Sequence, residues 1–419
     1  MVMSRINIVI IGSGAAGLAA AAAASDDGAS VLLVERETRL GGRLNQIVDC
    51  CFDSDSDNDD DLSRISGPEL AFARTSVLRD NGVAILLQTH VLSITSVGGT
   101  FQLTLSNRHG IMTVDAEKVI LATGSYEQPP RQLGIHGTRP SGVFTAGAAQ
   151  HYINVFGQLP AQNAVILGSG NISLNLARRL SLEGATVLGV YEPLSEPQAS
   201  LQTVAECLND FEIPLHLNHT VTRVFGSERL RAVEVFRTNK NGDPIYGTGG
   251  AVKCDSLFLS LNLVSDTDLA ESLGVKMCPT THAPICDQNG MTSLDGLFIC
   301  GSAAFISTTS SLVSKHGSLV GLSAARHFPH DRTAVKINGS KNFLTFLPQC
   351  VDIQNSSGEI TVFFRVDTHY NDRTVCLNVN SIDVCTEAFA RLRPQETYSI
   401  TASITSELTA ESKVALRLA

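Results

Sequence analysis

Two glycine-rich stretches carry the residue types and spacings best suited to holding a nucleotide. The first reads Gly12-Ser13-Gly14-Ala15-Ala16-Gly17 and lies where a strand-like run gives way to a helix-like run. The first glycine of such a turn allows a tight bend, the second lets a pyrophosphate approach the backbone, and the third lets the helix pack on the strand. Glu35 follows 23 positions after Gly12, at the end of the next strand-like run, where a carboxylate can accept hydrogen bonds from ribose hydroxyls. A glycine turn without a ligand is the alternative.

The second stretch repeats this pattern, with one change. It reads Gly168-Ser169-Gly170-Asn171-Ile172-Ser173, so Ser173 stands where the third glycine would be. Glu192 follows 24 positions after Gly168, and no Arg or Lys occurs from 187 to 200. The absence of a cation favours a ribose 2′-hydroxyl over a 2′-phosphate, and hence NAD over NADP. A retained fold that binds no nucleotide is the alternative.

Two further strand-like runs end in small residues. The run 119–121 is followed by Ala122-Thr123-Gly124, and the run 297–299 by Cys300-Gly301-Ser302. Small residues let the backbone come close to a ligand at the carboxyl edge of a sheet. Taken alone each is an ordinary strand end, but their order relative to the two glycine motifs makes them candidate cofactor contacts.

The elements that must position these motifs alternate between β-branched runs and Ala/Leu-rich runs, which is typical of βαβ units and a mostly parallel sheet. The stretch 351–400 instead has weak helical periodicity. The sequence therefore predicts an α/β fold with two Rossmann-like dinucleotide-binding domains and a small C-terminal antiparallel β-domain. The predicted boundaries are 1–137, 138–260, 261–328 and 329–419. The expected helices are 15–25 and 172–182, and the expected strand-like runs are 7–11, 30–35, 84–105, 118–121, 163–167, 186–191, 360–366 and 374–384.

The composition excludes several classes of protein. Net charge is −10, and six of the acidic residues lie in the run Asp53–Asp61, so clustered basic residues for nucleic acid are not expected. No apolar run is long enough for a transmembrane segment, and no leader sequence is evident. Ten scattered cysteines without a C-x-x-C pair indicate free thiols in a reducing, cytoplasmic setting and no metal site.

The aspartate run also fails as a calcium loop. A loop that starts at Asp53 needs glycine at position six and glutamate at position twelve, but these positions hold Asn58 and Arg64. A start at Asp55 fails in the same way. A solvated loop is the preferred interpretation, and a docking patch for a basic partner is the alternative.

Taken in this order, the motifs resemble those of the pyridine nucleotide–disulfide oxidoreductase family, and the resemblance covers nearly the whole chain. The run 137–150, GTRPSGVFTAGAAQ, resembles a bacterial subgroup of NAD/FAD-dependent oxidoreductases associated with anaerobic glycerol-3-phosphate dehydrogenase and similar to α-subunits of amino-acid and opine dehydrogenases. The resemblance implies FAD on the first motif and NAD(H) on Gly168, Gly170, Ser173 and Glu192. It implies that the residues around FAD are Gly12–Gly17, Glu35, Arg36, Gly42, Arg43, Val91, Ala122, Thr123, Gly124, Gly301 and Ser302.

The chain departs from this family at several points. The stretch after Gly42 has no C-x₄-C disulfide, and the vicinal pair Cys50-Cys51 could close only a strained ring. Ser302 stands where many members have aspartate. The run 307–318 holds no carboxylate, and its one residue that titrates in a useful range is His316, which we interpret as a surface or packing residue.

Three functions remain open at this stage. The leading hypothesis is an FAD-dependent oxidoreductase that exchanges hydride between NAD(H) and the flavin, as a subunit of a dehydrogenase assembly and without a redox disulfide. In the second hypothesis the chain still binds FAD, but its NAD site is non-functional. An amine or polyol is then oxidised on a partner subunit. The third is a flavin-binding scaffold whose catalytic residues have drifted. The expected partner is a small-molecule substrate or a partner dehydrogenase subunit, so the chain could form an oligomer or a hetero-complex. Nucleic acid is not expected as a partner.

Replacing Asp53–Asp61 by a Gly/Ser linker should leave the FAD content of the purified protein unchanged, because the run lacks the pattern of a ligand site. The measurement is the flavin absorbance per chain. Loss of flavin would show that the run supports the cofactor domain.

Overall fold

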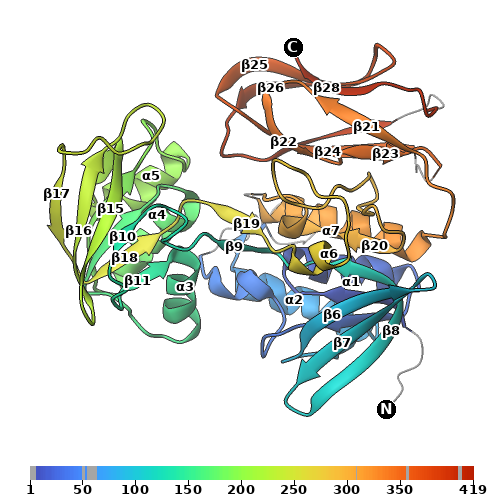
Figure 1. The fold of residues 1–419 in the computed structure, drawn as a ribbon, viewed down its shortest axis with the longest axis horizontal. Coiled ribbons are helices and arrows are strands. Elements are labelled where there is room, and N and C mark those ends of the chain that lie inside the picture. Colours follow the sequence, from blue (N-terminus) through green and yellow to red (C-terminus); the bar gives the residue numbers. More distant parts are fainter. Residues whose placement is uncertain (1–5, 50–51, 54–63, 308, 355–357, 404–407) are drawn as a thin grey trace. The chain divides into compact units, whose positions relative to one another are not determined.

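The computed structural model describes residues 6–49, 52–53, 64–307, 309–354, 358–403 and 408–419 (Figure 1). The chain divides into two units. The first unit comprises Met1–Asn45, Asp49–Ser125 and Ser265–Ala419, and the second comprises Gln46–Val48 and Tyr126–Val264. The finer boundaries after 137, 260 and 328 stay predictions. The chain leaves and re-enters the first unit along two paired strands, β9 (Ser125–Glu127) and β19 (Leu263–Ser265).

A seven-stranded sheet organises the first unit. Its order is β5-β2-β1-β8-β7-β6, and β20 also pairs with β8. The strands β5, β2, β1, β8 and β20 are parallel, whereas β6 and β7 add an antiparallel extension. Strands β1 and β2 are almost wholly buried, as expected of parallel strands covered on both faces. The strands are β1 (Ile6–Ile11), β2 (Val31–Val34), β5 (Ala84–Leu86), β6 (His90–Val97), β7 (Thr100–Asn107), β8 (Gly110–Leu121) and β20 (Leu297–Ile299), with the short pair β3 (Phe52–Asp53) and β4 (Arg64–Ile65) apart from the sheet.

Two helices of this unit, α1 (Ala15–Asp26) and α7 (Ser310–Arg326), pack directly on each other. Their approach is so close that a Cβ on Gly317 would lie 2.3 Å from the carbonyl oxygen of Ala16. Only glycine on α7 and small residues on α1 allow this distance, so the alanine-rich sequence of α1 is a packing requirement. The other helical segments of the unit are η1 (Gly42–Gln46, whose last residue belongs to the second unit), α2 (Gly67–Asp80), α6 (Asp268–Ser272) and η4 (Gly301–Ala303).

The second unit repeats the βαβ arrangement around a five-stranded sheet of order β11-β18-β12-β13-β14, in which every pair is parallel. A four-stranded sheet of order β10-β15-β16-β17 shares a buried cluster with it, in which Val165 and Leu257 meet Val224 and Val233. The elements are β10 (His136–Gly137), β11 (Val143–Thr145), α3 (Ala146–Gln150), η2 (His151–Val155), β12 (Asn163–Leu167), α4 (Asn171–Leu182), β13 (Thr186–Glu192), α5 (Leu201–Cys207), η3 (Asn209–Phe211), β14 (Leu215–Leu217), β15 (His219–Gly226), β16 (Leu230–Arg237), β17 (Gly250–Lys253) and β18 (Ser256–Leu259).

The last part of the first unit is the C-terminal β-domain, residues 334–418. Two sheets, of order β23-β21-β28-β25-β26 and β22-β24-β27, enclose a core that includes Val362, Phe364, Val375 and Leu377 (Figure 1). The strands are β21 (Ala334–Gly339), β22 (Phe343–Leu347), β23 (Cys350–Asp352), β24 (Glu359–Val366), β25 (Tyr370–Val379), β26 (Ile382–Leu392), β27 (Tyr398–Ser403) and β28 (Val414–Leu418).

The structure has the predicted α/β class, and it corrects two details of this last domain. The strand-like run 374–384 is a hairpin, because Asn380 and Ser381 have φ of 50° and 71° between β25 and β26. Asparagine tolerates this left-handed region, so the turn has no glycine to mark it. The domain is also not purely antiparallel, since β21 and β28 are a parallel pair.

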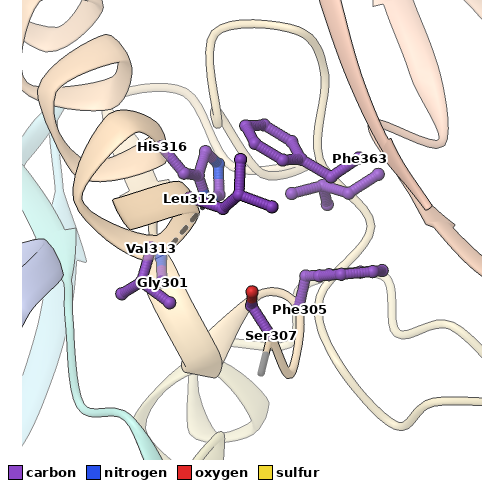
Figure 2. Close-up of a pocket in the computed structure, with 8 residues that line it drawn as sticks. Gly301, Phe305, Ser307, Leu312, Val313, His316 and Phe363 are labelled. Carbon is purple, nitrogen blue, oxygen red and sulfur yellow. Dashed lines mark hydrogen bonds between the residues drawn. The ribbon is translucent and has the colours of Figure 1, made fainter. Parts of the chain in front are cut away.

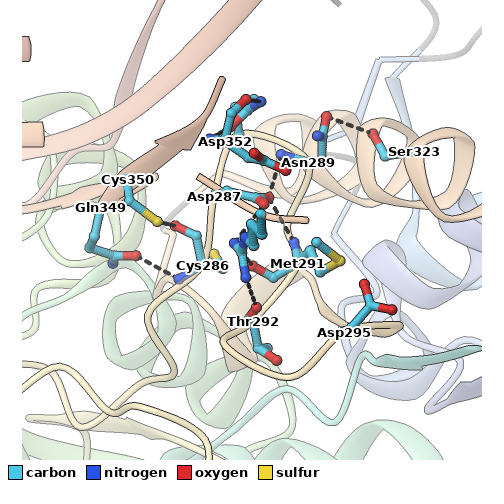
Figure 3. A network of polar contacts seen from close by, with 12 residues as sticks. Cys286, Asp287, Asn289, Met291, Thr292, Asp295, Ser323, Gln349, Cys350 and Asp352 are labelled. Atoms are coloured by element: carbon cyan, nitrogen blue, oxygen red, sulfur yellow. Dashed lines mark hydrogen bonds and ion pairs between the residues drawn. The ribbon is translucent and has the colours of Figure 1, made fainter. Parts of the chain in front are cut away.

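Buried polar contacts connect the loop 286–292 to the C-terminal β-domain and to the segment before it (Figure 3), and Gln288 and the backbone of Asp352 exchange two hydrogen bonds. The carboxylate of Asp287 has no exposed surface and lies 2.6 Å from Nη2 of Arg332. Asp352 on β23 is also fully buried and accepts a hydrogen bond from Nε2 of His330 at 2.6 Å. Burial raises the pKa of Asp287 to about 6, although Arg332 acts to lower it. The ion pair keeps this carboxylate charged at neutral pH.

Arg332→Met should destabilise the first unit, because it leaves the Asp287 carboxylate buried without a cation. Breaking a buried pair in this way costs about 3–5 kcal/mol, which urea unfolding at neutral pH would measure. The loss should shrink as the pH falls toward about 6 and be smallest below it, because removing Arg332 raises the pKa of Asp287 further and a protonated Asp287 needs no cation. The double variant Asp287→Asn/Arg332→Met should recover much of the stability. An equal loss above and below that pH would contradict the role of the pair.

Candidate functional site

The first glycine motif is held against the end of β2 by a buried carboxylate. The N–H of Ser13 donates to Oε2 of Glu35 at 2.9 Å, and the Ser13 hydroxyl donates to the same oxygen at 2.5 Å. Oε1 of Glu35 accepts from the N–H of Glu37 at 2.9 Å, and Ser13 Oγ accepts from the N–H of Gly41 at 3.2 Å. One serine therefore joins the motif, the strand end and the following loop.

The second motif is held in the same way. The N–H and hydroxyl of Ser169 donate to Oε2 of Glu192 at 2.9 and 2.6 Å. Oε1 accepts from the N–H of Leu194 at 3.0 Å, and Ser169 Oγ accepts from the N–H of Gln198 at 2.9 Å. Burial raises the pKa of Glu192, and the hydrogen bonds from Ser169 and Leu194 oppose this. We call these two arrangements the serine–glutamate locks.

The first two glycines of each motif have different structural roles, as predicted. Gly12 and Gly168 have φ of +98° and +102°, and a Cβ there would lie 2.5 and 2.1 Å from a neighbouring carbonyl oxygen, so both turns require glycine. Gly14 and Gly170 are the N-caps of helices α1 and α4, and beyond their chain neighbours no atom of the described residues lies within 4 Å of a Cβ placed on either. The two helix starts thus present open space at the position where a pyrophosphate would approach.

Neither helix start has a side-chain cap. Backbone N–H groups in the first turn of a helix have no intrahelical acceptor, so those of Ala15 and Ala16, for example, can bind phosphate oxygens, which the helix dipole also favours. Each lock places three donors on a glutamate that has about four acceptor positions, which leaves one for a ribose hydroxyl. The residues present therefore fit a dinucleotide in both units.

The third position of the motif differs between the two units. A Cβ on Gly17 would lie 1.9 Å from the carbonyl oxygen of Gly12, so the first unit requires glycine. Ser173 in the second unit is fully buried, and its hydroxyl donates to the carbonyl of Gly170 at 2.7 Å. The serine is accommodated inside the helix, and the lock beside it is intact.

The loop after β2 brings Gly42 and Arg43 back to the first motif. A Cβ on Gly42 would lie 3.0 Å from Cα of Gly14, so the loop lies directly against the motif. Arg43 is exposed, and its Nη2 donates to the carbonyl of Ser125 at 2.9 Å. Its guanidinium is thereby fixed at the carboxyl edge of the sheet, as a pyrophosphate contact would require.

The other predicted contacts next to Glu35 also lie in this part of the unit. Arg36 is exposed, and its Nε lies 3.8 Å from Oε1 of Glu37. Val91, near the start of β6, is partly buried and follows Thr89, whose N–H donates to the carbonyl of Glu35 at 3.0 Å. The chain before Val91 therefore passes beside the first lock.

The small-residue strand ends meet at the same edge of the sheet. The N–H of Ala122 donates to the carbonyl of Ile11 at 2.9 Å, and the Thr123 hydroxyl donates to the carbonyl of Asp266 at 2.6 Å. Gly124 follows them with φ of +82°. Gly301 follows β20, and a Cβ placed there would lie 2.5 Å from Cβ of Ala16. The structure thus brings 122–124, Gly301 and the first motif together.

His316 is a packing residue, one of the two alternatives expected from the sequence. It is not a surface residue: its side chain is buried, and its Nδ1 accepts a hydrogen bond from the N–H of Gly301 at 3.2 Å (Figure 2). Burial lowers its pKa to about 4, so the ring is neutral at physiological pH. Ser302 is partly buried, and its backbone carbonyl accepts a hydrogen bond from the Ser265 hydroxyl. The hydroxyl of Ser302 itself has no hydrogen-bond partner in the described part of the chain. No spacing in the sequence could have revealed the contact between His316 and Gly301.

Other chemistry is not evident in the part of the chain that the structure describes. No group of three or more His, Cys, Asp or Glu side chains there could hold a metal ion, and the eight described cysteines are free. None of the described helices combines the length and the apolar character needed to cross a membrane. The pair Cys50-Cys51 and most of the aspartate run, residues 54–61, lie outside the described residues.

Comparison with known proteins identifies relatives of this chain. The family model described as "Pyridine nucleotide-disulphide oxidoreductase" matches residues 6–322. An opine oxidase subunit of Agrobacterium tumefaciens (strain Ach5) is 24% identical over 324 residues, which are 72% of this chain and 61% of that protein. The α-subunit of sarcosine oxidase from Corynebacterium sp. (strain P-1) is 28% identical over 192 residues, 43% of this chain and 19% of that protein. The chain therefore spans less than two thirds of the length of these relatives.

The fold has counterparts among solved structures. The crystal structure of thioredoxin reductase from T. acidophilum superposes with a TM-score of 0.62 and 21% sequence identity, covering 77% of this chain and 98% of that one. The likeness shows a shared α/β fold.

Ser13→Ala and Ser169→Ala should each lower the thermal stability of the unit that contains the lock. Each change leaves a buried glutamate oxygen without its hydroxyl donor, which costs about 1–3 kcal/mol. Ser76→Ala is the matched control, because the Ser76 hydroxyl bonds only the carbonyl of Phe72 on an exposed surface. Thermal unfolding of the three variants checks the prediction, and equal effects at all three positions would contradict it.

Proposed function

The chain belongs to the pyridine nucleotide-disulphide oxidoreductase family, whose members use FAD and NAD(P)H, and we propose that it exchanges hydride between NAD(H) and a bound FAD as a subunit of a larger dehydrogenase assembly. The observation that carries this proposal is the duplicated serine–glutamate lock. The lock supports two competent nucleotide sites, one in each unit. The intact lock beside Ser173 argues against the alternative in which the second site is structural only.

FAD would supply the group that accepts and releases hydride. The residues of this chain would bind and orient the two cofactors. Glu35 would accept from the ribose of FAD, and the start of α1 with Arg43 would hold its pyrophosphate. Glu192 and the start of α4 would do the same for NAD(H). NAD is favoured over NADP because the residues that surround Glu192 from 187 to 200 include no Arg or Lys.

The partner subunit and the acceptor that takes electrons from the flavin are further parts of this proposal. The opine oxidase and sarcosine oxidase relatives are named as subunits, which supports a partner that handles the final substrate. The missing C-x₄-C and C-x-x-C motifs support transfer to an acceptor other than a disulfide. The link to the subgroup associated with glycerol-3-phosphate dehydrogenase rests on sequence resemblance in the run 137–150 and in 347–349 and 363–366 of the C-terminal β-domain.

The variants Gly14→Val and Gly170→Val test the proposed FAD site and the proposed NAD(H) site one at a time. Both backbones are extended, with φ of −66° and −72°, and a Cβ at either position would have no described atom within 4 Å beyond its chain neighbours. Both variants should therefore fold but obstruct a pyrophosphate. Gly14→Val should lose bound FAD, whereas Gly170→Val should keep FAD and raise the KM for NADH by about tenfold or more, a loss of at least 1.4 kcal/mol.

The matched control is Gly250→Val, at an exposed strand position that also has open space around Cβ. It should change neither flavin content nor the KM for NADH. The measurements are flavin absorbance per chain and NADH oxidation with an artificial electron acceptor. If Gly170→Val leaves the KM for NADH unchanged while the enzyme is active, the second site does not bind NADH.

A further inference from the structure

The second unit contains a partly buried carboxylate that belongs to neither serine–glutamate lock. Glu127, the last residue of β9, accepts a hydrogen bond from the backbone N–H of Gly147 at 3.1 Å through Oε1 and at 2.9 Å through Oε2. In the part of the chain that the structure describes, Gly147 is the one donor to this carboxylate. An ionised carboxylate has about four acceptor positions, so this shared N–H leaves about two of them for a ligand.

Gly147 makes room for the carboxylate. It is the second residue of α3, and a Cβ placed on it would lie 2.8 Å from Oε2 of Glu127. The backbone of Gly147 does not have a positive φ, so glycine is needed here for space and not for its conformational freedom. Because α3 directly follows β11, the carboxylate lies at the carboxyl end of that strand.

The strand order of the second unit indicates where the two halves of a bound dinucleotide would lie. In the order β11-β18-β12-β13-β14, the chain passes from β12 through β13 to β14 and later returns to β18 on the other side of β12. The strand order therefore reverses between β12 and β18, and a dinucleotide binds across such a point at the carboxyl ends of the strands. With one ribose at Glu192, at the end of β13, and the pyrophosphate at the start of α4, the second nucleoside would extend over β18 towards β11.

Glu127 is the charged group on this second side. The segments that follow β11 and β18, residues 146–150 and 260–262, hold no charged residue. Neighbouring strands are about 4.8 Å apart, so β11 lies roughly 10 Å from β12 across the sheet. The ribose of the second nucleoside is joined directly to the pyrophosphate, whereas the nicotinamide carboxamide is the far end of the molecule. The carboxamide is therefore the group that would reach the end of β11.

The carboxamide also has the matching chemistry. Its NH₂ group donates hydrogen bonds, and an ionised carboxylate only accepts them. A hydrogen bond to an ionised acceptor is stronger than one between neutral groups. We propose that Glu127 binds the NH₂ group of the nicotinamide carboxamide and thereby fixes the orientation of the ring. This inference rests on the proposed NAD(H) site and identifies the residue that positions the nicotinamide there.

The test compares three ligands by isothermal titration calorimetry of the full-length, FAD-containing protein. They are NAD⁺, its 3-acetylpyridine analogue, whose methyl ketone lacks the NH₂ group, and ADP-ribose, which lacks the nicotinamide ring. NAD⁺ should bind at least about tenfold more tightly than the analogue, a difference of 1.4 kcal/mol. Glu127→Ala should abolish this difference and leave the Kd for ADP-ribose unchanged. The readout is a dissociation constant, so it needs no turnover.

Gly147→Ala provides a second variant, which keeps the carboxylate of Glu127 but displaces it, and it should also reduce the difference between NAD⁺ and the analogue. One matched control is Glu183→Ala, at the opposite end of α4, where the carboxylate lies 2.6 Å from Nη2 of Arg179. The other is Gly250→Ala, at an exposed position with open space around Cβ. Both controls should keep the full difference.

The outcomes separate this inference from the proposed function. Equal affinities of the unaltered protein for NAD⁺ and the analogue would overturn the inference, although the second nucleotide site would stand. Equal losses of affinity for NAD⁺ and ADP-ribose in Glu127→Ala would do the same, because they would show a structural role only. Binding of neither NAD⁺ nor ADP-ribose would overturn the proposed function and this inference with it.

Discussion

The structure depends on one repeated constraint, the pair of hydrogen bonds by which a serine backbone N–H and hydroxyl meet a buried glutamate. Ser13 with Glu35 and Ser169 with Glu192 have nearly the same distances in two units of different sequence. A buried carboxylate is costly unless donors surround it, and the glycine turn supplies those donors only in one conformation. The carboxylate therefore fixes the turn, and the turn fixes the helix start, which we propose to hold the phosphates.

Close packing then gathers the other site elements around the first lock. Glycines on α7 allow its backbone to approach α1, which sets the position of His316 relative to Gly301. The C-terminal β-domain is joined to the same unit by the two hydrogen bonds between Gln288 and Asp352, and it contributes Leu347 and Phe363 to the buried cluster of that unit. The domain that follows the family-matched residues 6–322 is thus packed beside the proposed cofactor edge.

The sequence predicted the local features of this arrangement well. Expected strand 163–167 and helix 172–182 agree with β12 and α4 within one residue, because alternating βαβ patterns and glycine turns are determined by nearby residues. It did not predict the serine–glutamate hydrogen bonds, the contact of His316 with Gly301, or the Asp287–Arg332 pair. These contacts join residues between 15 and 45 positions apart, and no periodicity in a single sequence encodes them. The hairpin at Asn380 was missed because its turn lacks glycine.

The most direct test of the account is an anaerobic titration of the purified, FAD-containing protein with NADH, followed by flavin absorbance. Two competent nucleotide sites predict that the flavin band bleaches progressively and that the change is complete near about one NADH per flavin, since each NADH delivers one hydride. A flavin band that NADH leaves unchanged, in protein shown to contain FAD, would contradict the claim that both locks serve bound cofactors.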